Sequence, residues 1–136
     1  MNVEEARSFV RENHHAVLST RRTDGRPQLS PGAAAVDDAG RVIISTRETA
    51  IKVANLRRDP TVSLCVLADG FYGPWAQIDG RAELISLPDA LEPLVDYYRS
   101  VSGEHPDWDD YRAAMQRERR LLVRITIERA GPNRSG

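Results

Sequence analysis

The chain has 136 residues, of which 29% are charged, and its formal net charge is −1. These values predict one globular domain and argue against a broad nucleic-acid-binding surface, because phosphate neutralisation needs a clustered excess of cations. The single cysteine, Cys65, excludes an internal disulfide and any zinc or iron–sulfur site built from several cysteines.

In the first half of the chain, strands are predicted to follow one another through tight turns. Residues 3–13 have the periodicity of a short amphipathic helix. Asp24-Gly25 is a strong hairpin signal, because both positions tolerate positive φ. Strands are expected at 15–20, 27–36 and 41–45, and a helix at 49–58 that ends at Asp59-Pro60.

The second half adds three strands and a pair of helices. Strands are expected at 61–68, at 75–85 with a bend or bulge at Gly80, and at 119–129 with clean period-two alternation. Helices are expected from Ser86 to about residue 100 and over 107–117. About six strands, joined largely by hairpins, predict an antiparallel sheet or barrel. A barrel this small has a packed interior, so we expect a ligand in a groove outside it or between two subunits.

One domain is expected over residues 1–129, followed by a flexible tail over 130–136 that is polar and rich in turn formers. No apolar run approaches the roughly 18 residues needed to span a membrane. The start of the chain lacks the apolar stretch of a signal peptide. We therefore expect a cytoplasmic protein with neither a membrane nor a nucleic acid as partner.

The most informative segment lies where the third strand is followed by a helix. Ser45 and Thr46 end the strand, Arg47 follows, and the free N–H groups of a helix start favour an anion. Three helix residues, three positions apart, share one face: Lys52, Asn55 and Arg58. The pattern is typical of a phosphate pocket, and equally of a solvated helix face with ordinary capping.

Two further segments have the composition of contacts to a flat ligand. Pro27 and Pro31 interrupt a strand-like run. Either the hydrogen-bond donors of this run contact a planar ring, or the run is an irregular edge strand. Phe71, Tyr72 and Trp75 lie in a glycine-rich loop that can stack on a ring or anchor a subunit interface.

Groups with catalytic or metal-binding potential are few. His14 and His15 point to opposite faces if they begin a strand, which argues against a shared metal, and Cys65 lies mid-strand as an inert thiol. The run 117–120, Arg-Glu-Arg-Arg, favours a solvated surface. No catalytic residue is identified, so an enzyme of this sequence would take its chemistry from a bound cofactor.

Together, the segments DGRPQLS, KxxNLRRDPxVSL, DGRAEL and YRSVSGEHPDWDDYRAAM resemble the pyridoxamine 5′-phosphate oxidase-like split-barrel family. More narrowly, they resemble its actinobacterial branch that binds the deazaflavin coenzyme F420. The resemblance implies a mainly β fold with flanking helices, a six-stranded antiparallel split β-barrel of the FMN-binding type. It also implies a homodimer with the cofactor at the subunit interface and transfer of a hydride.

The resemblance also assigns roles to individual residues. Phosphate contacts are implied for Ser45, Thr46 and Lys52, and a place beside the cofactor for Asn55. The ring would be lined by Pro27, Gln28, Ser30 and Pro31, and the aromatic loop with Tyr72 and Trp75 would close the site. Ala50 stands where some relatives carry an arginine, and Arg47 is the expected substitute.

Three functions remain open from the sequence. The first is an F420-dependent reductase of a small electron-poor acceptor. The second is an FMN-dependent enzyme of the pyridoxamine-phosphate oxidase type. The third is a non-catalytic F420 carrier, which the absence of an evident acid or base allows.

Overall fold

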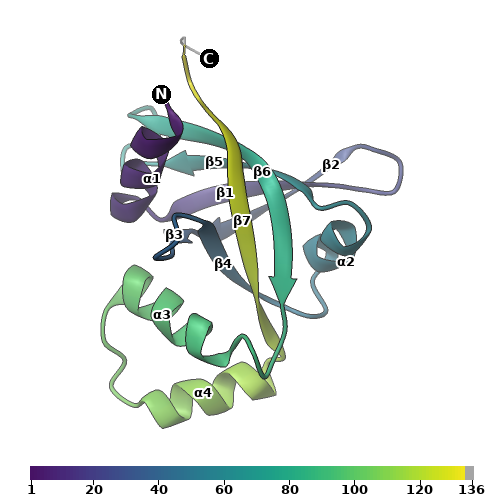
Figure 1. Cartoon of the computed structure of the whole chain (residues 1–136), viewed down its shortest axis with the longest axis vertical. Helices are drawn as coiled ribbons and strands as arrows, with labels where there is room; N and C mark the ends of the chain where they lie inside the picture. Colours follow the sequence, from purple (N-terminus) through teal and green to yellow (C-terminus); the bar gives the residue numbers. More distant parts are fainter. Residues whose placement is uncertain (134–136) are drawn as a thin grey trace.

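Seven antiparallel strands form one curled sheet in the order β2-β1-β5-β6-β7-β4-β3 (Figure 1). The computed structural model describes residues 1–133. Its elements are α1 Val3–Glu12, β1 His15–Arg21, β2 Pro27–Ala33, β3 Ala35–Val36, β4 Val42–Arg47, α2 Ile51–Arg58, β5 Thr61–Leu67, β6 Trp75–Ile85, α3 Leu91–Ser102, α4 Trp108–Arg117 and β7 Arg120–Gly131.

The sheet curls because its two edge strands are consecutive in the chain. Only Ala34 separates β2 from β3, and its N–H donates to the His14 carbonyl, which is the last bond in the β2–β1 register. A Cβ at Gly32 of β2 would lie 3.7 Å from Ile44 of β4, so the edges approach each other. The split barrel with flanking helices is confirmed. It has seven strands, not six, because the run expected over 27–36 is broken at Ala34.

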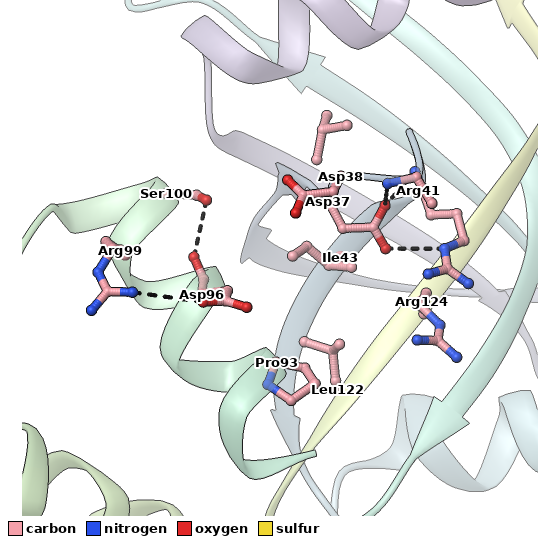
Figure 2. Close-up of a pocket in the computed structure, with 12 residues that line it drawn as sticks. Asp37, Asp38, Arg41, Ile43, Pro93, Asp96, Arg99, Ser100, Leu122 and Arg124 are labelled. Atoms are coloured by element: carbon pink, nitrogen blue, oxygen red, sulfur yellow. Dashed lines mark hydrogen bonds and ion pairs between the residues drawn. The ribbon is translucent and has the colours of Figure 1, made fainter. Parts of the chain in front are cut away.

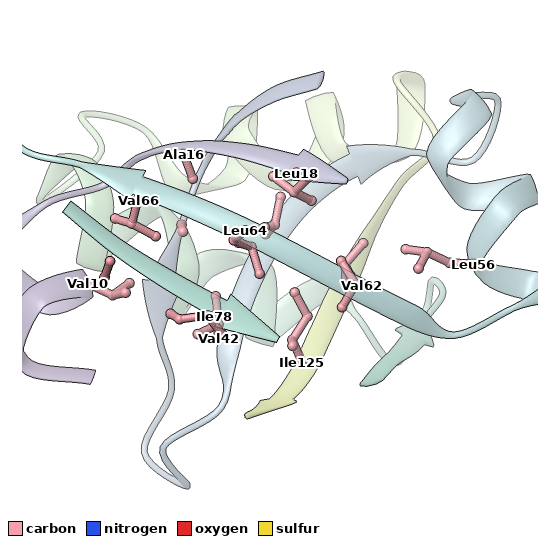
Figure 3. Packing of buried hydrophobic residues seen from close by; sticks show 14 of the residues in the cluster. Val10, Ala16, Leu18, Val42, Leu56, Val62, Leu64, Val66, Ile78 and Ile125 are labelled. Atoms are coloured by element: carbon pink, nitrogen blue, oxygen red, sulfur yellow. The ribbon is translucent and has the colours of Figure 1, made fainter. Parts of the chain in front are cut away.

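The barrel interior is filled by one face of each long strand (Figure 3). Leu18, Ile44, Leu64 and Ile78 come from four different strands and are fully buried there. Each such side chain contributes about 1.5–3 kcal/mol through burial of apolar surface. Val10 of α1 and Leu56 of α2 lie at opposite ends of this row. Helix α2 therefore covers one end of the barrel.

Helices α3 and α4 pack on the other face of β4 and β7. Ile43 and Leu122 point away from the barrel interior and are buried with Leu94, Tyr111 and Met115. Helix α3 begins at Leu91 rather than after Ser86, because the Ser86 hydroxyl donates to Glu48 and does not cap a helix. This second apolar layer fixes the position of the outer face of β4, which carries Ser45 and Arg47.

The last strand extends beyond the expected domain boundary at residue 129. Gly131 pairs with Gln77 in the sheet, and the amino group of Met1 donates to the Pro132 carbonyl and to Asn133 Oδ1. Residues 134–136 of the expected tail lie outside the described residues. Among residues 1–133, no helix has both the length and the apolar character that crossing a bilayer requires.

Candidate functional site

A group of cations gathers where β4, α2 and β7 meet. Arg47 ends β4 and lies directly opposite Arg120, the first residue of β7. The Glu118 carboxylate accepts from Arg120 at 2.8 and 3.0 Å and from Arg47 at 3.3 Å. Lys52 of α2 is half-buried close by, and among residues 1–133 no carboxylate lies within ion-pair distance of its ammonium. We call Arg47, Lys52, Glu118 and Arg120 the Lys52 cluster.

The electrostatics of the Lys52 cluster favour an anion. Burial lowers the pKa of Lys52, and the positive charge of Arg120 lowers it further. The cluster thus holds three cations and one carboxylate, which leaves a positive excess in a partly desolvated position. Such an excess attracts a phosphate or carboxylate ligand more strongly than it would at a fully hydrated surface.

Only one of the two hydroxyls that end β4 shares the face of this cluster. Thr46 pairs with Leu121, and its side chain is buried on the barrel side. Ser45 pairs with Leu122 and lies on the outer face with Arg47. Neighbouring strand residues point to opposite faces, so Ser45 and Thr46 do not present their hydroxyls to the same ligand.

Asn55 and Arg58 bond to the protein itself. The Asn55 amide is buried and donates to Thr20 Oγ1 at 3.1 Å, while its Oδ1 accepts from Arg58 at 3.1 Å. Arg58 also donates to the Arg21 carbonyl. Of the three residues predicted to share a helix face, Lys52 alone is without a hydrogen-bond or ion-pair partner in the described part of the chain.

Strand β2 presents its predicted ring contacts on two faces. Gln28 and Ser30 pair with Thr20 and Leu18 of β1 and face the barrel, whereas Pro27 and Pro31 are exposed on the outer face. Gln28 Oε1 accepts from Thr20 at 3.3 Å. The buried Ser30 Oγ has no hydrogen-bond partner among the described residues, which is uncommon in a native structure. An orphaned hydroxyl is suited to a polar group of a ligand.

Replacing Ser30 with alanine should therefore act in opposite directions on stability and on ligand binding. Removing a buried, unsatisfied hydroxyl is expected to raise the free energy of unfolding by about 1 kcal/mol. If a cofactor bonds to that hydroxyl, its affinity should fall in the same variant. Urea unfolding of the ligand-free protein and a cofactor titration measure the two effects. A less stable Ser30→Ala variant would contradict the assignment of Ser30 as unsatisfied.

The aromatic loop lies far from α2 within one chain. Phe71 and Tyr72 are 72% and 97% exposed, and their rings contact each other edge to face with centroids 5.1 Å apart. The loop follows the end of β5, whereas α2 precedes the start of β5. The loop and α2 therefore lie at opposite ends of this strand (Figure 1). Seven strand residues span roughly 20 Å. Tyr72 and half-buried Trp75 therefore do not join Lys52 in one monomeric site.

A cavity of about 510 Å³ between α3, the β3–β4 turn and β7 contains none of the predicted site residues (Figure 2). Each arginine that lines it already faces a carboxylate. Arg41 pairs with Asp37, Arg124 with Glu83, and Arg99 with Asp96 and Glu104. This cavity has no free cation comparable to Lys52, so it is a poorer anion site than the Lys52 cluster.

Two members of the Lys52 cluster are not predicted by any sequence pattern. Arg120 and Glu118 belong to the charged run 117–120, which was expected to be solvated. That expectation is wrong for Arg120, whose side chain is only 26% exposed. The only signal in the sequence is the strand predicted from residue 119. This strand places Arg120 in the sheet, but it does not predict which residue lies opposite Arg120.

Comparisons with known proteins agree with this fold. The family model of pyridoxamine 5′-phosphate oxidase matches residues 3–133. The crystal structure of the conserved hypothetical protein Rv2991 from Mycobacterium tuberculosis is similar with 30% identity and a TM-score of 0.77, covering 100% of this chain and 92% of that chain.

Two solved structures with names that state a function have the same fold at lower identity. An F420 reductase is 18% identical with a TM-score of 0.70, covering 91% of this chain and 94% of that one. The heme storage protein HutZ from Vibrio cholerae is 18% identical with a TM-score of 0.71, covering 96% and 94%. At this identity the likeness is one of fold. Because the family model spans nearly the whole chain, the protein belongs to the pyridoxamine 5′-phosphate oxidase family.

Proposed function

We propose that this protein binds coenzyme F420 and acts as an oxidoreductase that transfers a hydride between the reduced deazaflavin and a small electron-poor acceptor. The observation that carries the proposal is the Lys52 cluster, in which two arginines share one carboxylate beside a half-buried Lys52. The family, the DGRPQLS and KxxNLRRDPxVSL segments and the fold shared with an F420 reductase support it.

The described residues fit a cofactor with an anionic tail and a flat polar head. The cations of the Lys52 cluster supply charge for the tail, and Ser45 supplies a hydroxyl on the same face of β4 as Arg47. The orphaned Ser30 hydroxyl on β2 is available for a polar atom of the head. When bound, the cofactor supplies the hydride chemistry. The side chains of this protein then serve to hold cofactor and acceptor in register and to exclude water.

We further propose a homodimer with the cofactor at the subunit interface. The outer face of β2, β1 and β5 carries a row of paired side chains, Pro31, Val17 and Cys65, and Leu29 on the same face is 62% exposed. A second copy packed there would cover this apolar strip. In such a dimer, Phe71 and Tyr72 would extend to the cofactor site of the partner subunit. Within their own chain they do not reach the corresponding site.

Light scattering tests the assembly. We expect a species of twice the mass of one chain, because exposed apolar side chains at Leu29, Phe71 and Tyr72 gain about 25 cal/mol for each Å² they bury. A monomer that binds cofactor with undiminished affinity would contradict the interface placement.

Replacing Lys52 with alanine tests the cofactor site. The dissociation constant for F420 should rise by the equivalent of about 1–3 kcal/mol, the range for loss of a charged hydrogen-bond partner. Arg57→Ala is the matched control, because Arg57 is on the same helix and its charge is already offset by Glu48 at 2.7 Å. Fluorescence titration measures both variants. Equal affinity in Lys52→Ala and the native protein would refute the site.

The same titration separates the alternative functions. An FMN-dependent enzyme of the pyridoxamine-phosphate oxidase type should be yellow as purified and bind FMN more tightly than F420. A carrier should bind F420 tightly yet reduce none of a panel of enones, quinones and tetrapyrroles. The shared fold with a heme storage protein is the specific observation that favours including this third outcome.

A further inference from the structure

Arg120 lies at the point where four elements of the fold converge. It is opposite Arg47 of β4, and its charge lowers the pKa of Lys52 on α2, after the larger effect of burial. The same charge opposes the effect of burial on the pKa of Tyr97 on α3. The Tyr97 hydroxyl donates to the Ala33 carbonyl at 2.8 Å, where β2 ends.

The guanidinium of Arg120 is held by one oxygen of one carboxylate. Glu118 Oε1 accepts from Arg120 Nε and Nη2 and also from Arg47 Nη2. Like charges directly opposite each other on paired strands are destabilising, and Glu118 offsets only one of the two. Arg120 retains an Nη1 group with no hydrogen-bond partner among residues 1–133, so it can donate to an anion without leaving Glu118.

The backbone before Arg120 is fixed in an unusual conformation. Arg119 has a φ of 53°, in the left-handed region that a residue with a side chain adopts infrequently. Its carbonyl accepts from the Glu48 N–H at 2.9 Å, which ties the junction of α4 and β7 to the segment between β4 and α2. Such strain persists where the surroundings determine the backbone, and here it sets Glu118 and Arg120 beside the end of β4.

We propose that Arg120 is the second cationic ligand of the cofactor tail, beside Lys52, and that Glu118 is the positioning residue that holds its guanidinium. The proposal rests on the proposed cofactor site. The positive charge that is missing at the position of Ala50 is thereby assigned to Arg120 rather than to Arg47. The Arg47 side chain is 57% exposed and that of Arg120 is 26% exposed, so the charge of Arg120 is less screened by water and acts more strongly on an anion.

The experiment compares two arginines of the same strand. Arg124 is also on the outer face of β7 and donates through Nε and Nη2 to one oxygen of Glu83, at 2.9 and 2.7 Å. Its side chain is 23% exposed, close to that of Arg120. Arg120→Met should raise the dissociation constant for F420 about ten- to hundredfold, whereas Arg124→Met should leave it unchanged.

Three more variants separate charge from structure. Arg120→Lys should recover part of the lost affinity, because it restores the charge but not the planar donor set. Glu118→Gln keeps an oxygen that accepts from Arg120 but removes the negative charge, so it should lower the dissociation constant below that of the native protein. Glu118→Ala removes the acceptor as well and should raise the dissociation constant, because the Arg120 guanidinium is then no longer held.

The outcomes distinguish this proposal from the proposed function. If Lys52→Ala loses F420 and Arg120→Met does not, the assignment of Arg120 is overturned while the cofactor site stands. If the native protein binds neither F420 nor FMN, the proposed function fails, and titration of the same variants with inorganic pyrophosphate then decides the role of Arg120. Equal pyrophosphate affinity in Arg120→Met and Arg124→Met would overturn it.

Discussion

Replacing Gly80 with alanine should lower the free energy of unfolding by about 2–3 kcal/mol, which is large for one added methyl group. Gly80 lies in β6 where the pairing with β7 shifts register after Asp79. A Cβ there would lie well inside van der Waals contact with the Thr126 carbonyl oxygen and 2.9 Å from Ile125 Cγ2. The carbonyl belongs to the backbone of β7, so relief of the clash requires moving a central strand. Urea unfolding measures the loss.

Gly70→Ala is the matched control for this variant. A Cβ at Gly70 would have no atom within 4 Å, and the residue does not adopt a positive φ. The free energy of unfolding of Gly70→Ala should stay within about 0.5 kcal/mol of the native value. Equal stability of the two variants would mean that β6 and β7 are not paired in the register described above.

The bulge at Gly80 illustrates what the sequence predicts well. A lone glycine inside a long strand pattern indicates a bulge or a close backbone approach, and the structure has both at this residue. The alternation of β7 likewise predicts one face with Leu121, Val123 and Ile125, which are buried in the barrel. These features are local, because strand periodicity and backbone sterics depend on neighbouring residues.

The division of the run 27–36 into β2 and β3 depends on distant groups. Ala34 still bonds to the His14 carbonyl in the β1 register, and the Tyr97 hydroxyl donates to the Ala33 carbonyl, whereas from Ala35 on the chain pairs with β4. None of these partners is visible in a propensity pattern. The extra strand is thus set by tertiary contacts that close the barrel.

The candidate site could be predicted only where one helix or strand carries it. The spacing of Lys52, Asn55 and Arg58 predicts one shared helix face, but it does not predict the contacts that these side chains make with other elements. Asn55 meets Thr20, which is 35 positions earlier in the chain, and Arg120 meets Arg47 across a strand pairing that joins the middle of the chain to its end. Register and long-range pairing are decided by the whole sheet.

Replacing Asn55 with alanine should lower the free energy of unfolding by about 2–3 kcal/mol. This expectation gives Asn55 a structural role, whereas the family resemblance implies a contact with the cofactor. The variant loses the hydrogen bond to Thr20 at 3.1 Å and the acceptor for Arg58 at 3.1 Å, both at a nearly buried position. Each lost bond of this kind costs about 1 kcal/mol, and the cavity adds to the loss. A double-mutant cycle with Thr20→Val should give a coupling of about 1 kcal/mol.

Lys52→Ala is the natural comparison, because Lys52 lies one turn earlier on the same helix without a hydrogen-bond or ion-pair partner in residues 1–133. Its removal relieves repulsion from Arg120, so stability should change little while cofactor affinity falls. Asn55→Ala should show the reverse pattern: lower stability in urea unfolding, and nearly native affinity in the fraction that remains folded. A stable Asn55→Ala variant with weakened cofactor binding would show that the amide serves the ligand rather than the joint between α2 and β1.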